Sequence, residues 1–364
     1  MADGETKTAA RGARFGHGFL RDIWYFAALE SELRPGRPIR RVMLGEPVLL
    51  ARSPGGQLLA LRDICPHRAA PLSAGRFTRE ADGAESLECA YHGWRFATDG
   101  RCRAIPSLTA DDTLEPGRIV VRRYPAVESQ GLILVWMGSE TRTEIDIPAP
   151  PRFPGVVGGR PKLTDAMTFD AHIDHAVVGL MDPAHGPFVH RQWWWRSRRS
   201  MHAKAKRFEP APEGFVMVRH APSRNSRAYA LLGGAPRTEI SFRLPGWRYE
   251  HIEAGRRQVL SLTCLTPETE TRTRITQVLW TDHPVFALAG PLVRAGARRF
   301  LRQDGAMVDL QNQGLKYDPP LMWIDDADRQ AKWYQALKRE WIASRAEQRA
   351  FVNPVEPATL RWTS

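Results

Sequence analysis

Two short stretches decide how the first part of the chain folds: CPHRAAPLSAGRF at residues 65–77 and LECAYHGWRFATDGRCRAIPSL at residues 87–108. Each holds one cysteine and one histidine close together, namely Cys65 with His67 and Cys89 with His92. Glycine and proline flank both pairs, so we expect two loops here and no regular structure. Two thiolates and two imidazoles carried by neighbouring loops can converge on one metal centre.

This set of side chains fits two kinds of centre. One is a tetrahedral zinc site, and the other is a Rieske cluster, in which two cysteines hold one iron and two histidines hold the other. Zinc sites usually repeat one element, as C-x-x-C or H-x-x-x-H, whereas the mixed pairs C-x-H and C-x-x-H are the Rieske arrangement. The two remaining cysteines, Cys102 and Cys264, are expected to be buried structural thiols.

The composition of the whole chain is that of a folded protein. Its 364 residues are 43% hydrophobic and 25% charged, which excludes a disordered chain and favours two domains. Four cysteines are too few for a disulfide scaffold, and no apolar stretch is long enough to cross a membrane. The first 16 residues contain no apolar run typical of a signal peptide, so we expect a cytoplasmic protein.

The chain is basic, with 52 Lys and Arg against 40 Asp and Glu and a net charge of +12. The charge is spread along the sequence, and its densest stretch is RQWWWRSRRSMHAKAKR at residues 191–207. No nucleic-acid recognition motif accompanies this stretch, so we interpret it as a docking surface for an acidic protein such as a ferredoxin. Its tryptophans, Trp193, Trp194 and Trp195, are candidates for stacking against a flat substrate.

Changes of pattern along the chain divide it into four segments. They are an N-terminal tail at 1–19, a strand-rich domain at 20–140, a proline-rich linker at 141–163 and a second domain at 164–364. In the strand-rich domain the turn signals predict hairpins of 47–51 with 57–62 and of 118–124 with 132–137.

The second domain mixes helices and strands. A helix is predicted near residues 170–181, and another around 331–341. Between them lie strand-like runs typical of an antiparallel meander, at 214–220, 239–244, 258–264 and 273–280. We therefore predict an α+β protein.

A second candidate metal site lies in the C-terminal half, where LMDPAHGPFVH at residues 180–190 supplies His185 and His190. On an unbroken helix these side chains would diverge by about 140°, so they converge only if the helix is interrupted. We predict that Gly186–Pro187 is this interruption. Two histidines and one carboxylate on one face of an iron leave open positions for oxygen and substrate.

The carboxylate is expected from FLRQDGAMVDLQNQ at residues 300–313, where apolar residues at helical spacing mark a buried face. Asp304 falls on that face, and a carboxylate turned into a core needs a cation or strong donors. Asp309 points elsewhere and is the alternative. Asp182, three residues before His185, is placed to orient that histidine.

The two cysteine–histidine stretches resemble the Rieske domain of the Rieske non-heme iron oxygenases, above all the oxygenase components of the pheophorbide a oxygenase-like and the vanillate or caffeine demethylase-like branches. The resemblance covers residues 20–345 and implies an all-β Rieske domain followed by a catalytic domain with helices on an antiparallel, helix-grip-like sheet. It implies that Cys65 and Cys89 bind one iron of a [2Fe-2S] cluster and that His67 and His92 bind the other. The family's late Gln-Asp pair matches Gln303-Asp304, so the resemblance implies that His185, His190 and Asp304 bind a mononuclear Fe(II).

The resemblance also implies an activity. A ferredoxin or reductase passes electrons from NAD(P)H to the cluster, and the enzyme uses O2 to hydroxylate a small aromatic substrate or to remove an O- or N-methyl group from it. One alternative is a cis-dihydroxylating dioxygenase of the same family, and another is an electron-transfer or zinc-binding protein without oxygenase chemistry. In such oxygenases the residue that matches Asp182 reaches a cluster histidine of the next subunit in a homotrimer, which here would be His92. Many relatives carry Glu-Asn shortly before that aspartate, whereas this chain has Val178-Gly179-Leu180-Met181.

Overall fold

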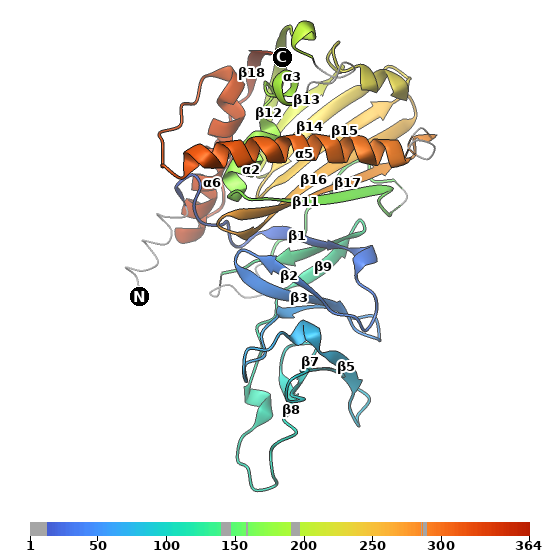
Figure 1. Cartoon of the computed structure of the whole chain (residues 1–364), viewed down its shortest axis with the longest axis vertical. Coiled ribbons are helices and arrows are strands. Elements are labelled where there is room, and N and C mark those ends of the chain that lie inside the picture. Colours follow the sequence, from blue (N-terminus) through green and yellow to red (C-terminus); the bar gives the residue numbers. More distant parts are fainter. Residues whose placement is uncertain (1–12, 140–146, 158, 191–196, 285, 287–289) are drawn as a thin grey trace. The chain divides into compact units, whose positions relative to one another are not determined.

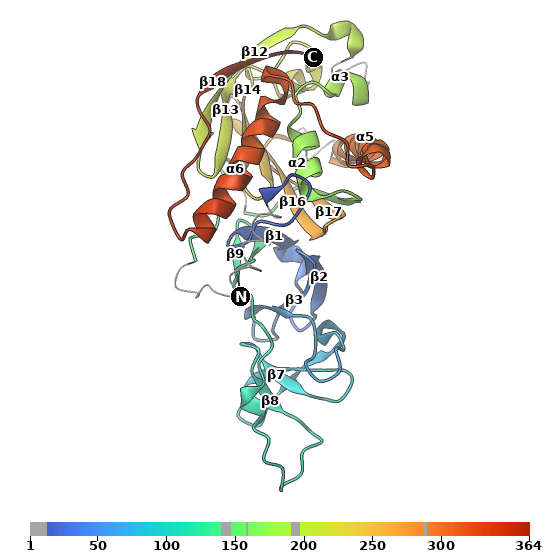
Figure 2. The same ribbon diagram turned by 90° about the vertical axis from the view of Figure 1, so that its left-hand side faces the viewer.

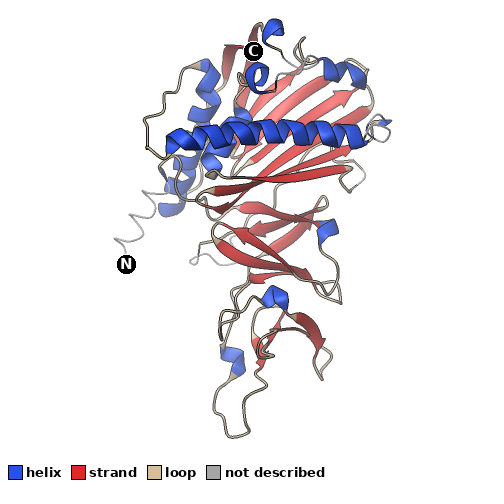
Figure 3. Cartoon of the chain, in the orientation of Figure 1, coloured by secondary structure: helices blue, strands red, loops and turns tan. Residues whose placement is uncertain are grey.

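The computed structural model describes residues 13–139, 147–157, 159–190, 197–284, 286 and 290–364. These residues form two compact units, Arg21–Arg152 and Phe153–Ser364, and the second unit also includes the described residues before Arg21. The first unit contains strands and single helical turns, whereas the second combines strands with long helices (Figure 3). The predicted α+β class, with a strand-only N-terminal domain, is therefore confirmed.

Within the described residues of the first unit, ten strands form three antiparallel sheets (Figure 1). The strands are β1 (Trp24–Leu29), β2 (Ile39–Met43), β3 (Glu46–Arg52), β4 (Leu58–Arg62), β5 (Arg76–Arg79), β6 (Glu85–Glu88), β7 (Arg95–Ala97), β8 (Cys102–Ala104), β9 (Ala126–Ser129) and β10 (Leu132–Trp136). Their orders are β1-β10-β9, β2-β3-β4 and β5-β6-β7-β8. One loop with predicted cluster residues joins β4 of the second sheet to β5 of the third, and the other joins β6 to β7 within the third sheet.

The second unit is built on one antiparallel sheet of eight strands in the order β11-β17-β16-β15-β14-β13-β12-β18. The strands are β11 (Leu163–Phe169), β12 (Ala203–Ala211), β13 (Gly214–His220), β14 (Arg237–Arg243), β15 (Trp247–Ala254), β16 (Arg257–Thr269), β17 (Arg272–Thr281) and β18 (Ala358–Thr363). The helices are α2 (Ile173–Met181), α3 (Gly186–Val189), α5 (Gly290–Leu315) and α6 (Arg329–Ala346). None of the described helices is both long and apolar enough to span a bilayer.

The helices α2, α5 and α6 cover one face of this sheet (Figure 2). Helix α5 packs against β11, where Phe169 approaches Gly305, and α6 packs against β13, where Phe215 contacts Trp333. Part of the opposite face is covered by Phe153, whose ring contacts aromatic side chains of β15. The predicted ligand Asp304 lies on α5, within this helical layer.

Most of the predicted elements are present, including the hairpin of β3 and β4 and the helices α2 and α6. The predicted strand Arg118–Tyr124 is wrong. The amide of Val121 donates to the carbonyl of Gly100, and the amide of Tyr124 donates to the carbonyl of Ala60. Because these partners belong to different sheets, the segment bridges the sheets, and β9 takes the predicted place beside β10.

The end of the predicted N-terminal tail belongs to the second unit. The amide of Gly16 donates to the carboxylate of Asp174 at 2.7 Å, and Lys338 Nζ donates to the same oxygen at 2.6 Å and to the His17 carbonyl at 2.8 Å. The hydroxyl of Tyr334 donates to the other carboxylate oxygen at 2.6 Å. We call Gly16, Asp174, Tyr334 and Lys338 the polar hub, because they join the N-terminal segment, α2 and α6 in the interior.

Candidate metal centres

Two loops of the first unit carry the four predicted cluster residues, and the loops share one backbone pattern. In each, the cysteine amide donates to the carbonyl five residues later, and the amide four residues later donates to the cysteine carbonyl, at 2.8–3.1 Å. The residue four positions after Cys65 is Ala69 with φ +56°, and four positions after Cys89 is Gly93 with φ +70°. Each loop therefore closes on itself and presents its own cysteine and histidine.

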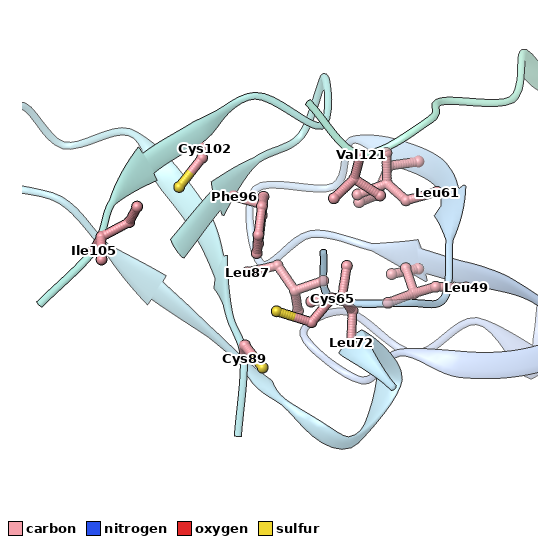
Figure 4. Close-up of a cluster of buried hydrophobic side chains, with 12 residues drawn as sticks. Leu49, Leu61, Cys65, Leu72, Leu87, Cys89, Phe96, Cys102, Ile105 and Val121 are labelled. Atoms are coloured by element: carbon pink, nitrogen blue, oxygen red, sulfur yellow. The ribbon is translucent and has the colours of Figure 1, made fainter. Parts of the chain in front are cut away.

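The side chains of Cys65 and Cys89 lie next to each other in the hydrophobic core of the unit (Figure 4). Burial raises the pKa of Cys65 to about 11; the backbone amide of His67 opposes this shift, and the adjacent Cys89 thiol adds to it. Free thiolates are therefore disfavoured here, whereas a metal cation that replaces the thiol protons is favoured. Cys102 is buried in the same core, but it lies on β8, outside both loops.

The two predicted histidines also meet. The ring centroids of His67 and His92 are 4.5 Å apart, and the Trp94 ring stacks on His67 at 4.7 Å. The Nδ1 atom of His67 is buried and has no hydrogen-bond partner among the described residues. Buried ring nitrogens normally have a partner, so this atom fits a metal ligand.

The second unit brings His185, His190 and Asp304 together. The Nε2 atoms of the two histidines are 3.1 Å apart, and Asp304 Oδ1 lies 3.7 Å from His185 Nε2 and 3.4 Å from His190 Nε2. The three possible ligand atoms lie within 4.8 Å of one another. Two imidazoles and one carboxylate in this arrangement can bind one transition-metal ion and leave other coordination positions open.

The two histidines occupy the ends of the short helix α3, with His185 at its N-cap and His190 at its C-cap. The predicted interruption at Gly186–Pro187 is wrong, because this dipeptide begins α3. Proline is tolerated there, since the first amides of a helix need no partner within it. Helix α2 does end at Asp182, which has a non-helical ψ of 119°, but that break precedes both histidines. His185 and His190 both have helical backbone angles, so their side chains meet from the two ends of one helical turn without an interruption between them.

A neighbouring residue fixes the outer nitrogen of each histidine. His185 Nδ1 lies 2.9 Å from the backbone carbonyl oxygen of Asp182, whose carboxylate is 3.7 Å away. His190 Nδ1 lies 3.2 Å from Gln303 Oε1. Both contacts leave Nε2 directed at Asp304. No role in holding His190 was predicted for Gln303, and its position directly before Asp304 was the only signal.

The electrostatics of the triad favour a cation. Burial raises the pKa of Asp304 to about 6, although the charges of His185 and Arg248 oppose the shift. Burial lowers the pKa of His185, but the hydrogen bond and charge of Asp182 outweigh it, so the net shift is upward. A bound metal ion would compensate the charge of this half-buried carboxylate.

A pocket of about 270 Å³ opens beside the triad. Besides Asp182, His185 and Asp304, its wall includes apolar side chains of α2, α5 and β17, among them Leu180, Ile275, Leu301, Met307 and Val308. Such a lining suits a small, largely apolar compound. The predicted stacking residues Trp193, Trp194 and Trp195 and the start of the basic stretch lie outside the described residues.

Known protein families match the two units of the chain separately. A model of the Rieske [2Fe-2S] domain matches residues 23–125, and a model of the vanillate O-demethylase oxygenase C-terminal domain matches residues 169–344. Similar proteins include Protein TIC 55, chloroplastic, from Pisum sativum, which is 35% identical over 51% of this chain and 32% of its own length. The oxygenase component of dicamba O-demethylase from Stenotrophomonas maltophilia is 37% identical over 48% of each chain.

Both curated relatives are thus matched over half of their length or less. A solved structure, dicamba monooxygenase bound to dicamba, has a TM-score of 0.69 at 23% identity and matches 91% of this chain and 99% of its own. At that identity the likeness is one of fold.

Proposed function

Because this chain belongs to the Rieske oxygenase family, we propose that it is a terminal oxygenase that uses O2 and two electrons to oxidise a small aromatic compound. The observation that carries the proposal is the convergence of His185, His190 and Asp304 in a chain that also holds the two cysteine–histidine loops. An electron-transfer or zinc-binding protein would not need this second set of ligands. A likeness in fold alone would not have been sufficient, because one fold can host many functions.

We propose that Cys65 and Cys89 hold one iron of a [2Fe-2S] cluster and that His67 and His92 hold the other. The paired loops, the two buried free thiols and the unsatisfied Nδ1 of His67 support this set. We further propose that His185, His190 and Asp304 hold Fe(II). When bound, the cluster supplies single electrons and the Fe(II) provides the place where O2 is reduced.

The protein's own residues orient and shield the second centre. Asp182 and Gln303 hold the two imidazoles so that both Nε2 atoms face one point. The apolar wall of the pocket limits access of water to the reacting groups. The carboxylate of Asp182 is 33% exposed, and His92 is partly exposed. We therefore propose a homotrimer in which Asp182 of one subunit meets His92 of the next.

We propose mono-oxygenation as the reaction. A substrate C–H bond, O2, two electrons and two protons yield the C–OH product and water; if the carbon is that of a methoxy group, the product releases formaldehyde and a free hydroxyl. The names of the matched C-terminal domain and of dicamba O-demethylase favour demethylation. Dihydroxylation is the alternative, which uses the same electrons but places both oxygen atoms in the product.

The electrons must come from a partner protein, for which we propose a ferredoxin or reductase that draws on NAD(P)H. The excess of positive charge on the chain fits an acidic partner. All four cysteines are free, which suits a reducing compartment, and we propose the cytoplasm.

Metal analysis of anaerobically purified protein tests the proposal. We expect about three irons and two acid-labile sulfides per chain, with a Rieske EPR signal after reduction. Two irons and two sulfides would leave a protein that only transfers electrons. If zinc were the only metal found, the proposals of a [2Fe-2S] cluster and of an Fe(II) site would both be wrong.

A further inference from the structure

The pocket beside the triad follows helix α2, which contacts α5 (Figure 2). Its wall holds Asp182 at the C-terminal end of α2 and His175 near the N-terminal end. The helix between these two residues is about 10 Å long, so His175 lies at the end of the pocket away from the triad. Trp323 belongs to the same end, because the ring of Phe15 contacts both side chains.

A second hollow, of about 640 Å³, lies beyond that end of the pocket. His175 and Trp323 line both hollows, so these two side chains belong to the wall between them. Charged residues that are exposed to solvent also line the second hollow, namely Arg14, Asp170, Glu270, Lys316 and Asp318. We call this hollow the outer basin, since it is open to water.

Phe15 completes the wall between the outer basin and the pocket. Its ring meets the His175 ring edge to face at 4.8 Å between centroids, and it meets the Trp323 ring in the same way at 5.5 Å. Burial lowers the pKa of His175 to about 4, so the imidazole is neutral near pH 7 and the wall carries no charge. Neither His175 nor Trp323 forms a side-chain hydrogen bond with another described residue, so packing holds both rings in place.

The segment that carries Trp323 has little structure of its own. Residues 316–325 connect α5 to the helical turn before α6 and contain no helix or strand. The neighbours of Trp323 point to solvent, with Met322 87% and Ile324 57% exposed. The indole therefore turns inward from a segment that few contacts hold to the rest of the unit.

The segment that carries Phe15 is held firmly on one side only. The amide of Gly16 donates to the carboxylate of Asp174 in the polar hub, and Gly16 has a φ of +80°. On the other side of Phe15, the guanidinium of Arg14 pairs with Asp318 at 2.8 Å, and both side chains are largely exposed. Exposed ion pairs contribute little stability, so this tie to the Trp323 segment can open while Gly16 stays anchored.

The opposite end of the pocket faces protein in the proposed homotrimer, because Asp182 of one subunit meets the next subunit there. A compound that approaches from solvent then has to come from the outer basin or past Met307, which lines the pocket on α5 and is 42% exposed. The outer basin leads to the wall of three rings, and that wall separates it from the triad.

We propose that Phe15, His175 and Trp323 form a gate through which the substrate passes from the outer basin to the triad. The gate opens when the Phe15 and Trp323 rings move into the basin, and the space between them then limits the size of the compounds that enter. The inference rests on the proposed oxygenase function, and it adds the residues that select which compounds reach the metal.

Removal of the mononuclear iron by a chelator tests the gate without measuring turnover. 1,10-Phenanthroline is a flat aromatic compound that turns red when it binds Fe(II), and it has to enter the pocket to reach the triad. Bathophenanthroline disulfonate is bulky and charged, so it captures only iron that has already left the protein. The difference between the two rates, measured anaerobically on the metal-loaded enzyme, is the rate of entry. The visible spectrum of the cluster shows that its irons stay in place.

We expect entry to be about 10-fold faster in Phe15→Ala and in Trp323→Ala, because each variant loses ring contacts that keep the gate closed. Tyr317→Ala is the matched control, since it removes an 81% exposed ring from the same segment, and its entry rate should equal that of the wild type. Met307→Ala widens the alternative route and should also have little effect.

The possible failures can be told apart. The two gate variants are independent, so if one does not fold, the other decides. An unchanged entry rate in a folded gate variant, or faster entry in Met307→Ala alone, overturns the gate and leaves the oxygenase standing, because the iron is still present. A wild type from which neither chelator removes iron while the cluster is intact has no mononuclear iron, and this result overturns the oxygenase and the gate together.

Discussion

The two candidate metal centres are constructed in opposite ways. In the first unit each cysteine lies within three residues of its histidine, and each loop closes with its own backbone hydrogen bonds inside one hydrophobic core. In the second unit the triad needs the α2–α3 segment and the distant helix α5, and the helical layer depends in part on the polar hub. A local site should therefore tolerate changes elsewhere in its unit, whereas a site built by helix packing should not.

The largest expected effect is a complementary loss of the two centres. Cys89→Ser should remove the cluster and keep the mononuclear iron, and Asp304→Ala should remove the mononuclear iron and all turnover while the cluster remains. Iron and sulfide analysis with EPR distinguishes the two outcomes. Cys102→Ser and Asp309→Ala serve as controls, since both residues lie outside the ligand sets, and both should retain both centres. Loss of both centres in either Cys89→Ser or Asp304→Ala would contradict their independence.

The polar hub gives the next largest effect. Asp174→Asn leaves the ammonium of Lys338 buried without a negative partner, because Lys338 is only 2% exposed and its other acceptors are neutral backbone carbonyls. We expect a loss of about 3–5 kcal/mol in the free energy of unfolding of the second unit. Chemical denaturation followed by tryptophan fluorescence measures it, while the visible spectrum of the cluster should not change. The exposed pair of Arg14 and Asp318 is the control, and Asp318→Asn should change stability little. A loss as large in Asp318→Asn would contradict the importance of burial.

Stability should also depend on pH in the second unit through His175. Burial lowers the pKa of His175 from 6.5 to about 4. Below pH 6.5 the unfolded chain binds a proton here and the folded protein does not, so stability is full above 6.5 and falls as the pH drops towards 4. The slope from this residue is at most about 1.4 kcal/mol per pH unit. Chemical denaturation at several pH values between 7.5 and 5.5 measures this. The free energy of unfolding should fall less steeply with falling pH in His175→Gln than in the wild type, and equal slopes would refute His175 as the origin.

The smallest effect concerns the two matched loop positions. Gly93→Ala places a Cβ at φ +70° and 3.3 Å from Pro106 Cγ, which should cost about 1–2 kcal/mol. Ala69→Gly relieves the same left-handed conformation in the other loop and should stabilise it by less than about 1 kcal/mol. The denaturant midpoint for loss of the cluster spectrum measures both. If the two variants shifted the denaturant midpoint in the same direction, the two loop positions would not be equivalent.

The contrast between a local site and a site assembled by helix packing also explains how much of each candidate centre could be predicted from the sequence. The cluster loops were visible because their residues are close in sequence. Asp304 could be predicted because an acidic residue interrupts an apolar helix face. Lys338 gave no such signal, because a lysine on a helix normally faces solvent. Strand β15 was missed because Arg248 and Glu250 alternate with apolar residues as on an exposed strand, although here they face the interior between sheet and helices.

The place of Gly16 in the polar hub bears on how the chain is synthesised. The second unit begins before Arg21 and resumes at Phe153, so the first unit is an insertion within it. When the insertion has left the ribosome, all of its strands are present and its loops can close. Gly16, by contrast, must wait until Lys338 has been synthesised, long after the insertion is complete. We therefore expect the order of folding to be inside out, with the inserted unit native while its host is still incomplete.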